Sequence, residues 1–376
     1  MKKAIIPIIF ALAGTSFVTY SYLDAFIIAK KYDVSYNATN AASNFSFSFK
    51  EMESNPSVVS VFSSNSSNQN SNSEPSSPTS EAPLDENKYY EDLTKEEIAA
   101  LFTKEKVFIP KQHYSDPDIY VDITSDRFED YSTYYAADIR IRSLSYLKTA
   151  IAHDNPGENY VEKTSDMCNR HKGIIAIDGD TYGSQKNGYV IRNGQVLRST
   201  KNLSRKKPED LAIYADGTFE IFNERDYTLD EIAAKGAWQV FSFGPGLVSE
   251  GKKIIKKGEE VGTAASQNRN QRCAIGMISP LHYVFVVSDG RIKSSPGLSL
   301  YQIGMIMERK HCYCAYNFDG GGSATMYFDD GTGNANGNGA LINYCTQELV
   351  GNKVVLPDAP PIEEREISDC VYIGKE

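Results

Sequence analysis

The stretches GYVIRNGQVLR (188–198) and LAIYADGTFEIF (211–222) decide the fold class of this sequence. Each carries β-branched and aromatic residues on both sides of a dipeptide, Asn-Gly or Asp-Gly. A two-residue type I′ turn needs residues that tolerate positive φ, so each stretch predicts an antiparallel hairpin. HYVFVVSDGRI (282–292) has the same form around Asp289-Gly290 and predicts a third hairpin.

Other runs in the second half of the chain favour strands as well. They are YYAADIRI (134–141), GIIAID (173–178), WQVFSF (238–243) and CAIGMI (273–278). Helices are fewer. Capping boxes at Thr94 with Glu97 and at Ser299 with Gln302 predict two, and a third is expected near residues 165–171. The pattern predicts one α+β domain over residues 88–376, with a mixed, largely antiparallel sheet and a few helices.

The N-terminal segment is a membrane signal. After Lys2 and Lys3 come about twenty mostly apolar residues without charge, enough to span the roughly 30 Å core of a bilayer. Ala11-Leu12-Ala13 has the form of a signal-peptide cleavage site, but cleavage there would leave a very short apolar region. We therefore expect residues 1–31 to be an uncleaved single-pass anchor with the catalytic domain outside the cytoplasm, and secretion after cleavage is the alternative.

A spacer separates this anchor from the folded part. In SSNSSNQNSNSEPSSPTS (63–80), thirteen of eighteen residues are Ser or Asn and none is aliphatic or aromatic. Such a stretch has no apolar surface to offset the entropy of ordering, so residues 32–87 are expected to be a disordered linker.

Composition excludes several classes of protein. The chain has 376 residues, 41% hydrophobic and 23% charged, which is ordinary globular usage. Its formal net charge of −10 gives no electrostatic attraction to nucleic acid, so no nucleic-acid partner is expected. Six cysteines without C-x-x-C spacing favour buried thiols with at most one bridge over a zinc site.

The strongest local feature is NFDGGGSATM (317–326), which lies between two strand-like runs. Three consecutive glycines let backbone N–H groups converge on an anion such as phosphate without obstruction by side chains. Asp319 adds a carboxylate, and Ser323 and Thr325 add hydroxyls. A flexible hairpin loop is the alternative interpretation.

Two further stretches lie at predicted strand ends. DGDTYG (178–183) offers Asp178, Asp180 and Tyr182, which could bind a metal, act as acid and base or contact sugar hydroxyls; a solvated turn is the alternative. Arg272, before CAIGMI, and Arg291, after the Asp289-Gly290 turn, present planar paired donors that match phosphate.

No metal or cofactor motif accompanies them. DDGTGNANGNG (329–339) has the composition of a calcium loop without its spacing or final Glu. The sequence requires no cofactor; it leaves a divalent cation such as calcium open without supporting it, and assigns no metal ligand.

Taken in order, these segments resemble the phosphodiester glycosidase family. NFDGGGSATM is similar to the family's N-L-D-G-G-G-S-S-T-M, and AIDGDTYG (176–183) to its A-I-N-G-D-Y-Y-G. SFGPGLVSEGK, NQRCAIG, VVSDGR and the late REISDCVYI also resemble family segments, in the expected order. The resemblance extends over about residues 131–373 and points to the exopolysaccharide-associated bacterial branch. Where the family has Asn, Pro and Thr, this chain has Asp178, Gln271 and Cys273.

The resemblance implies hydrolysis of a sugar-1-phosphodiester at the glycosidic C–O bond, in a cell-surface glycan or glycopolymer. Asp319 and Asp180 would flank the anomeric carbon, and Tyr182 would stack on the sugar. Asp369 and Arg365 would support the site, with a surface strand as the alternative. The residues assigned to catalysis are Asp319, Asp180 and Asp178. Those assigned to substrate and phosphate binding are Arg272, Gly320, Gly321, Gly322, Ser323, Thr325, Tyr182 and Arg291.

Two other functions stay open at this point. A non-catalytic carbohydrate-binding or scaffold module in exopolysaccharide assembly would use the same pocket without turnover, and Asp178 in place of Asn favours it. A phosphodiesterase that breaks the P–O bond would normally need metals held by clustered carboxylates.

Overall fold

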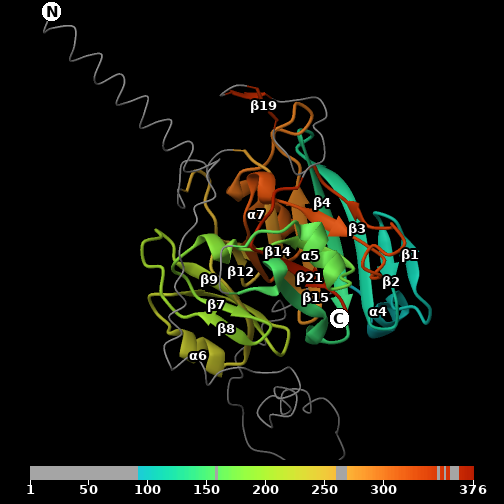
Figure 1. Ribbon diagram of the computed structural model, residues 1–376, viewed down its shortest axis with the longest axis horizontal. Coiled ribbons are helices and arrows are strands. Elements are labelled where there is room, and N and C mark those ends of the chain that lie inside the picture. The colour runs from blue at the N-terminus through green and yellow to red at the C-terminus, as the bar shows by residue number, and fades with distance from the viewer. Residues whose placement is uncertain (1–91, 157–159, 260–268, 345–347, 351–352, 356–363) are drawn as a thin grey trace, which may run out of the picture.

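The structure is a computed structural model that describes residues 92–156, 160–259, 269–344, 348–350, 353–355 and 364–376 (Figure 1). The predicted anchor (1–31) and linker (32–87) lie outside these residues, as does Cys345. Within the described ranges, no helix combines the length and apolar character needed to cross a bilayer.

Three antiparallel sheets form the domain. The first has nine strands in the order β1-β2-β3-β4-β15-β14-β16-β12-β13. Their bounds are β1 Val107–Ile109, β2 His113–Ser115, β3 Ile119–Phe128, β4 Ser132–Ile141, β15 His282–Ser288, β14 Cys273–Ser279, β16 Cys314–Asn317, β12 Gly246–Ser249 and β13 Lys252–Lys253.

The other sheets are smaller. The second has the order β10-β9-β11-β7-β8 and the third β18-β17-β6-β21-β5. The second comprises β10 Phe219–Asn223, β9 Glu209–Tyr214, β11 Ala237–Phe241, β7 Val190–Arg192 and β8 Gln195–Arg198. The third comprises β18 Ala340–Leu341, β17 Met326–Phe328, β6 Ile175–Asp178, β21 Asp369–Ile373 and β5 Leu147–Ile151. A separate pair joins β19 Glu348–Val350 to β20 Lys353–Val355.

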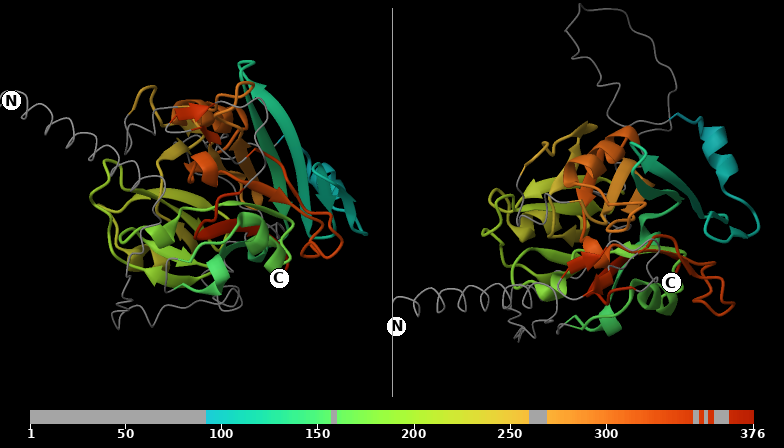
Figure 2. Two further views of the ribbon diagram at one scale, coloured as in Figure 1. Left: turned by 45° about the horizontal axis from the view of Figure 1, so that its top comes forward. Right: turned by 90° about the horizontal axis from the view of Figure 1, so that it is seen from above.

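The helices are short. They are α4 Lys95–Leu101, α5 Thr164–Arg170, α6 Leu229–Ala234 and α7 Leu300–Arg309, with 3-10 turns at Leu144–Tyr146, Ala152–Asp154, Tyr182–Ser184 and Gly321–Ser323. Figure 2 shows β3 and β4 as a long curved hairpin along one side of the molecule, with α4 beyond it.

The sheets share one core, and strand alternation explains how. In β15, Tyr283, Phe285 and Val287 belong to a cluster with residues of all three sheets, whereas Val284 and Val286 face the opposite way. Successive side chains of a strand point to opposite faces, so a strand buried on both faces reads as a continuous apolar run. The core therefore lies between the sheets.

Each sheet has a helix on its outer face (Figure 1). Ile303 of α7 packs in a cluster with residues of the first sheet, Ile232 of α6 with the second, and Met167 of α5 with the third. The apolar stripe of each helix thus covers the sheet face that does not meet the shared core.

Most of the predicted local structure is confirmed. The capping boxes at Thr94 and Ser299 begin α4 and α7, and the Asn-Gly and Asp-Gly pairs join β7 to β8 and β9 to β10. The described strand pairings are all antiparallel, which confirms the prediction of a largely antiparallel sheet.

The prediction of a hairpin at Asp289-Gly290 is wrong. The hairpin is formed by β14 and β15, which turn between Ser279 and His282, and Asp289-Gly290 follows the end of β15. At Gly290 an added Cβ would lie 2.3 Å from the backbone nitrogen of Gln271. Close approach of two backbones, and not a tight turn, therefore accounts for this glycine.

Candidate active site

Strand register brings the DGDTYG and NFDGGGSATM segments together. In the β6–β17 pair Met326 lies opposite Ile177, so the end of β6 meets the start of β17. The Thr325 amide donates to Asp178 Oδ1 at 3.2 Å, and the Asp178 amide donates to the Thr325 carbonyl at 3.3 Å. The two segments are therefore neighbours, although more than a hundred positions separate them in the sequence.

The segment around Arg272 joins the same place. In the β14–β16 pair Ala274 lies opposite Asn317, so the start of β14 meets the end of β16. The Gly321 amide then donates to the Gln271 carbonyl at 3.0 Å, and the Asp319 amide to the Gly179 carbonyl at 3.2 Å. Three segments that were singled out separately thus form one site at the edge where the first and third sheets meet.

Each glycine of the loop faces a different arginine. A Cβ added to Gly320 would lie 3.8 Å from Arg272 Nη1, and one added to Gly321 would lie 3.2 Å from Arg291 Nη2. A Cβ added to Gly322 would lie 2.8 Å from Nη2 of Arg365. The absence of side chains lets three guanidinium groups lie against one stretch of backbone.

Backbone and side-chain contacts fix these arginines. Arg272 is 6% exposed and its Nε donates to the Leu298 carbonyl at 3.0 Å; Arg291 Nε donates to Asn270 Oδ1 at 2.8 Å. Burial, and then the charge of Arg291, lower the pKa of Arg272 to about 10. An anion bound here would oppose both effects, because it would stabilise the charged guanidinium.

Arg365 approaches from the C-terminal segment. Its Nη1 lies 3.4 Å from Ser323 Oγ, and its side chain is exposed where Ser323 is buried. Arg365 therefore closes the outer side of the glycine loop.

Two of the predicted carboxylates differ in environment. Asp319 is partly exposed, and its Oδ1 accepts the Gly320 amide at 2.7 Å. Asp178 is fully buried, and among the described residues its Oδ2 has no hydrogen-bond partner. Burial raises the pKa of Asp178 well above its usual range, and the charge of Asp319 adds to the rise. The environment of Asp178 thus disfavours its charged form, whereas Asp319 is partly exposed.

Asp178 also contacts Cys273. The thiol lies 3.9 Å from the Asp178 carbonyl, and burial raises the pKa of the thiol well above its usual range. The five described cysteines are buried and free of disulfides. Burial thus disfavours the charged forms of both groups, either of which would place an uncompensated charge in the core.

The structure places Asp180 in a buried ion-pair network. Arg192 Nη2 lies 2.6 Å from Asp180 Oδ1 and 2.9 Å from Asp369 Oδ2. Asp180 also accepts the amides of Tyr182 at 3.0 Å and Ser242 at 2.7 Å. Its carboxylate oxygens are therefore occupied by internal donors, and this geometry favours a role in holding the loop.

Asp369 and Tyr182 complete the network. Burial and the charge of Asp180 raise the pKa of Asp369 to about 7, against the opposing effect of Arg192. Tyr182 is 6% exposed, its ring centre lies 5.4 Å from the Arg192 guanidinium, and burial raises its pKa. Thr181 has a φ of 56°, a conformation that is uncommon for a β-branched residue and often found at functional sites.

Arg192 was not identified from the sequence, although a signal existed. It ends an apolar run just before Asn193-Gly194, and an arginine on a strand that is buried almost always needs a carboxylate partner. The partner could not be chosen from the sequence, because Asp180 and Asp369 come from opposite ends of the domain.

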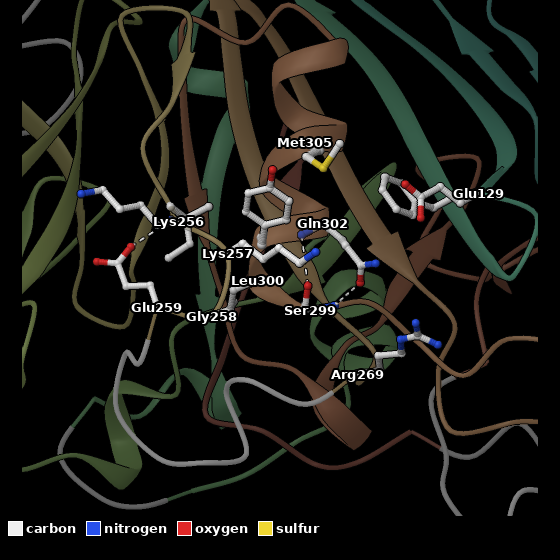
Figure 3. A pocket seen from close by; sticks show the side chains of 13 residues that line it. Glu129, Lys256, Lys257, Gly258, Glu259, Arg269, Ser299, Leu300, Gln302 and Met305 are labelled. Atoms are coloured by element: carbon white, nitrogen blue, oxygen red, sulfur yellow. Dashed lines mark hydrogen bonds between the residues drawn. The ribbon is translucent and has the colours of Figure 1, made fainter.

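A cavity of about 370 Å³ lies beside this site, at the start of α7 (Figure 3). Basic side chains of Lys256, Lys257 and Arg269 line it together with Ser299 and Gln302. Ser299 follows Leu298, whose carbonyl accepts the bond from Arg272. Ser299, which lines the cavity, is thus adjacent in the sequence to the residue that holds Arg272 at the glycine loop. The cavity was not predicted from the sequence.

Comparison with known proteins agrees with this arrangement. A family model described as phosphodiester glycosidase matches residues 171–373, more than half of the chain. The chain belongs to this family. The matched region contains every residue assigned above to catalysis and to phosphate binding.

Individual relatives are more distant. The catalytic domain of zebrafish N-acetylglucosamine-1-phosphodiester alpha-N-acetylglucosaminidase, auto-inhibited by its pro-peptide, superposes with a TM-score of 0.53 at 21% identity, covering 72% of this chain and 88% of that one. This likeness shows a shared fold. The SPbeta prophage-derived uncharacterized protein YomE of Bacillus subtilis strain 168 is 29% identical over 168 residues, 43% of this chain. The match spans a quarter of the length of that relative.

Metal ligands were left unassigned by the sequence. In the described ranges, no group of three or more His, Cys, Asp or Glu side chains is arranged to hold a metal ion.

Proposed function

We propose that this protein hydrolyses a sugar-1-phosphodiester at the glycosidic C–O bond and releases a free sugar and a phosphomonoester. Membership of the phosphodiester glycosidase family supports the reaction class. The observation that carries the proposal is the glycine loop, where Asp319 is adjacent to three residues that face three arginines.

The chemistry suits these groups. A phosphate is a good leaving group, so the site needs anion recognition more than strong acid assistance. The C1–O bond breaks with its electron pair on the phosphate oxygen, the hydroxyl of a water molecule bonds to C1, and the other proton of that water goes to the phosphomonoester or to solvent. Arg272 and Arg291 hold the phosphate, and Asp319 supplies the carboxylate that acts at the anomeric carbon.

The buried carboxyl groups have supporting roles in this proposal. Asp180 and Asp369 hold Arg192 and thereby fix the 178–183 loop against β21. Asp178 is buried and its pKa is raised, so this proposal assigns the carboxylate that meets the substrate to Asp319 alone.

We further propose a cell-surface glycan or glycopolymer as the substrate, presented to a domain anchored outside the cytoplasm by residues 1–31. The apolar N-terminal segment supports the location. The cavity at the start of α7 supports a polymer, because its lining of three basic residues (Lys256, Lys257, Arg269) and two acidic ones (Glu129, Glu259) offers polar contacts to further parts of such a substrate.

The test is hydrolysis of N-acetylglucosamine-1-phospho-6-mannose, with a panel of other sugar phosphodiesters, by the purified full-length protein in oxygen-18 water. Asp319→Asn is expected to lower kcat by about 100-fold or more, as for the loss of a catalytic carboxylate. Asp230→Asn, an exposed aspartate on α6, serves as the matched control.

The position of the label separates the alternatives. Oxygen-18 in the released sugar supports C–O cleavage, and oxygen-18 in the phosphate would identify a phosphodiesterase. Binding without release from any diester, in protein that unfolds cooperatively, would replace the proposal with a non-catalytic carbohydrate module.

A further inference from the structure

Three separate segments each place an arginine at the glycine loop. Arg272 precedes β14, Arg291 follows β15 and Arg365 precedes β21. Their guanidinium groups lie against three successive glycines, at 3.8, 3.2 and 2.8 Å from the positions that Cβ atoms would occupy. Because the three segments belong to two different sheets, the arrangement is fixed by the fold and not by one flexible loop.

The number of arginines matters when substrate and product are compared. A phosphodiester has two terminal oxygens and one negative charge. Cleavage of the C–O bond leaves the former bridging oxygen on the phosphate, so the phosphomonoester has three terminal oxygens. Its second pKa is about 6, so it carries nearly two charges at pH 7. Each guanidinium can donate paired bonds to phosphate oxygens.

We infer that this site binds the phosphomonoester product more tightly than the diester substrate, and that Arg365 is the residue that discriminates between them. The inference rests on the proposed function and adds to it a regulatory property, inhibition of the reaction by its own phosphate product. Arg272 and Arg291 serve both ligands, whereas Arg365 meets the oxygen that cleavage exposes.

The positions of the arginines agree with this division. Arg272 and Arg291 are held through Nε by Leu298 and Asn270, which places an Nη atom of each at the loop. Arg365 is exposed and contacts Ser323 at 3.4 Å, at the outer side. Burial, and then the charge of Arg291, lower the pKa of Arg272, so an additional negative charge beside these two guanidinium groups is favourable.

The experiment compares two binding constants and one inhibition constant in the full-length protein. Isothermal titration calorimetry gives the Kd of mannose 6-phosphate and of the intact diester, N-acetylglucosamine-1-phospho-6-mannose, with Asp319→Asn used to prevent turnover. Inorganic phosphate is a second probe. Competition during hydrolysis gives the inhibition constant of mannose 6-phosphate.

We expect the monoester to bind about 10-fold more tightly than the diester at pH 7.5, the effect of one additional charged hydrogen bond. The preference shrinks at pH 5.5, where the monoester is mostly a monoanion. Arg365→Gln is expected to weaken the monoester by about 10-fold and the diester by less than about 3-fold. Arg225→Gln, an exposed arginine after β10, leaves both constants unchanged.

Equal affinities for the two ligands, or equal weakening of both by Arg365→Gln, would overturn the inference. The result is separable from that of the proposed function, because calorimetry needs no turnover. If no diester is hydrolysed but the monoester still binds more tightly through Arg365, the proposed reaction fails and the assignment of Arg365 stands. Hydrolysis without product inhibition refutes the inference alone.

Discussion

Replacement of Arg192 tests whether the buried ion-pair network holds the site together. Arg192→Met keeps most of the side-chain volume and removes the charge that lies between Asp180 and Asp369. Arg192 Nη1 also donates to the Val240 carbonyl at 2.6 Å, so the substitution leaves this carbonyl of β11 without that hydrogen bond. The perturbation therefore reaches all three partners at once.

The expected magnitude follows from burial. The side chains of both aspartates are 0% exposed and that of Arg192 is 3% exposed. Breaking such a pair by removing one partner typically costs about 3–5 kcal/mol, because the remaining charge is buried and uncompensated. We expect a loss of unfolding free energy of this size at pH 7.5, measured by urea denaturation. Arg225→Met, an exposed control, should change it by less than about 0.5 kcal/mol.

The dependence on pH identifies the cause. In the parent protein the pKa of Asp369 is raised to about 7, so the folded state holds a proton that the unfolded state releases near pH 4. Stability therefore falls as pH rises from about 4 to 7. Without Arg192 the charge that opposes the rise is lost, so the pKa of Asp369 rises further and this fall in stability extends to higher pH. The loss caused by Arg192→Met must be smaller at pH 5 than at pH 7.5. A loss below about 1 kcal/mol, or the same loss at both pH values, would refute the reasoning.

Three further changes test other parts of the structure. The raised pKa of Asp178 makes the parent protein less stable as pH rises, and Asp178→Asn should remove this decline. The melting temperature of the variant minus that of the parent should therefore increase between pH 5 and pH 9. A difference that stays constant with pH would contradict the raised pKa. Gly290→Ala places a Cβ within 2.3 Å of the Gln271 backbone nitrogen. The rate of diester hydrolysis should fall by about 100-fold. An unchanged rate would show that the backbone at Gln271 moves aside without effect on the site. Thr228→Ala removes the capping box of α6 and should lower the free energy of unfolding by about 1 kcal/mol in urea denaturation; an unchanged free energy would contradict the role of this cap.

Local chemistry made much of the fold predictable. The dipeptides at Asn193 and Asp216 fix two hairpins, because only certain residues accept the required φ values. The capping box at Thr228 was equally readable and was overlooked, as was the ten-residue strand β3. The alternation of apolar and polar residues predicts a strand but does not identify the strand it pairs with. For this reason, neither the division into three sheets nor the position of β21 between β6 and β5 could be predicted from the sequence.

In the candidate site too, residues within one sequence segment could be predicted, whereas contacts between distant segments could not. The run of three glycines marked a place of close approach, and Asp319 lies within it, so both could be named from the sequence. That Arg365 lies against Gly322 depends on the register of β21 with β6, which joins residues far apart in the chain. Asp180, which was predicted to be a catalytic carboxylate, pairs with Arg192, a partner that the sequence did not reveal.

The position of β21 in the third sheet has a consequence for folding during translation. The strand pairs on one side with β6 and on the other with β5, and it carries Asp369 into contact with Arg192. A nascent chain that has been translated only as far as the glycine loop therefore has a gap in its third sheet, and Arg192 lacks one of its two carboxylate partners. The gap is filled only once the chain has been made as far as Ile373, so the third sheet and the network around Arg192 are completed by a strand that follows the glycine loop in the sequence.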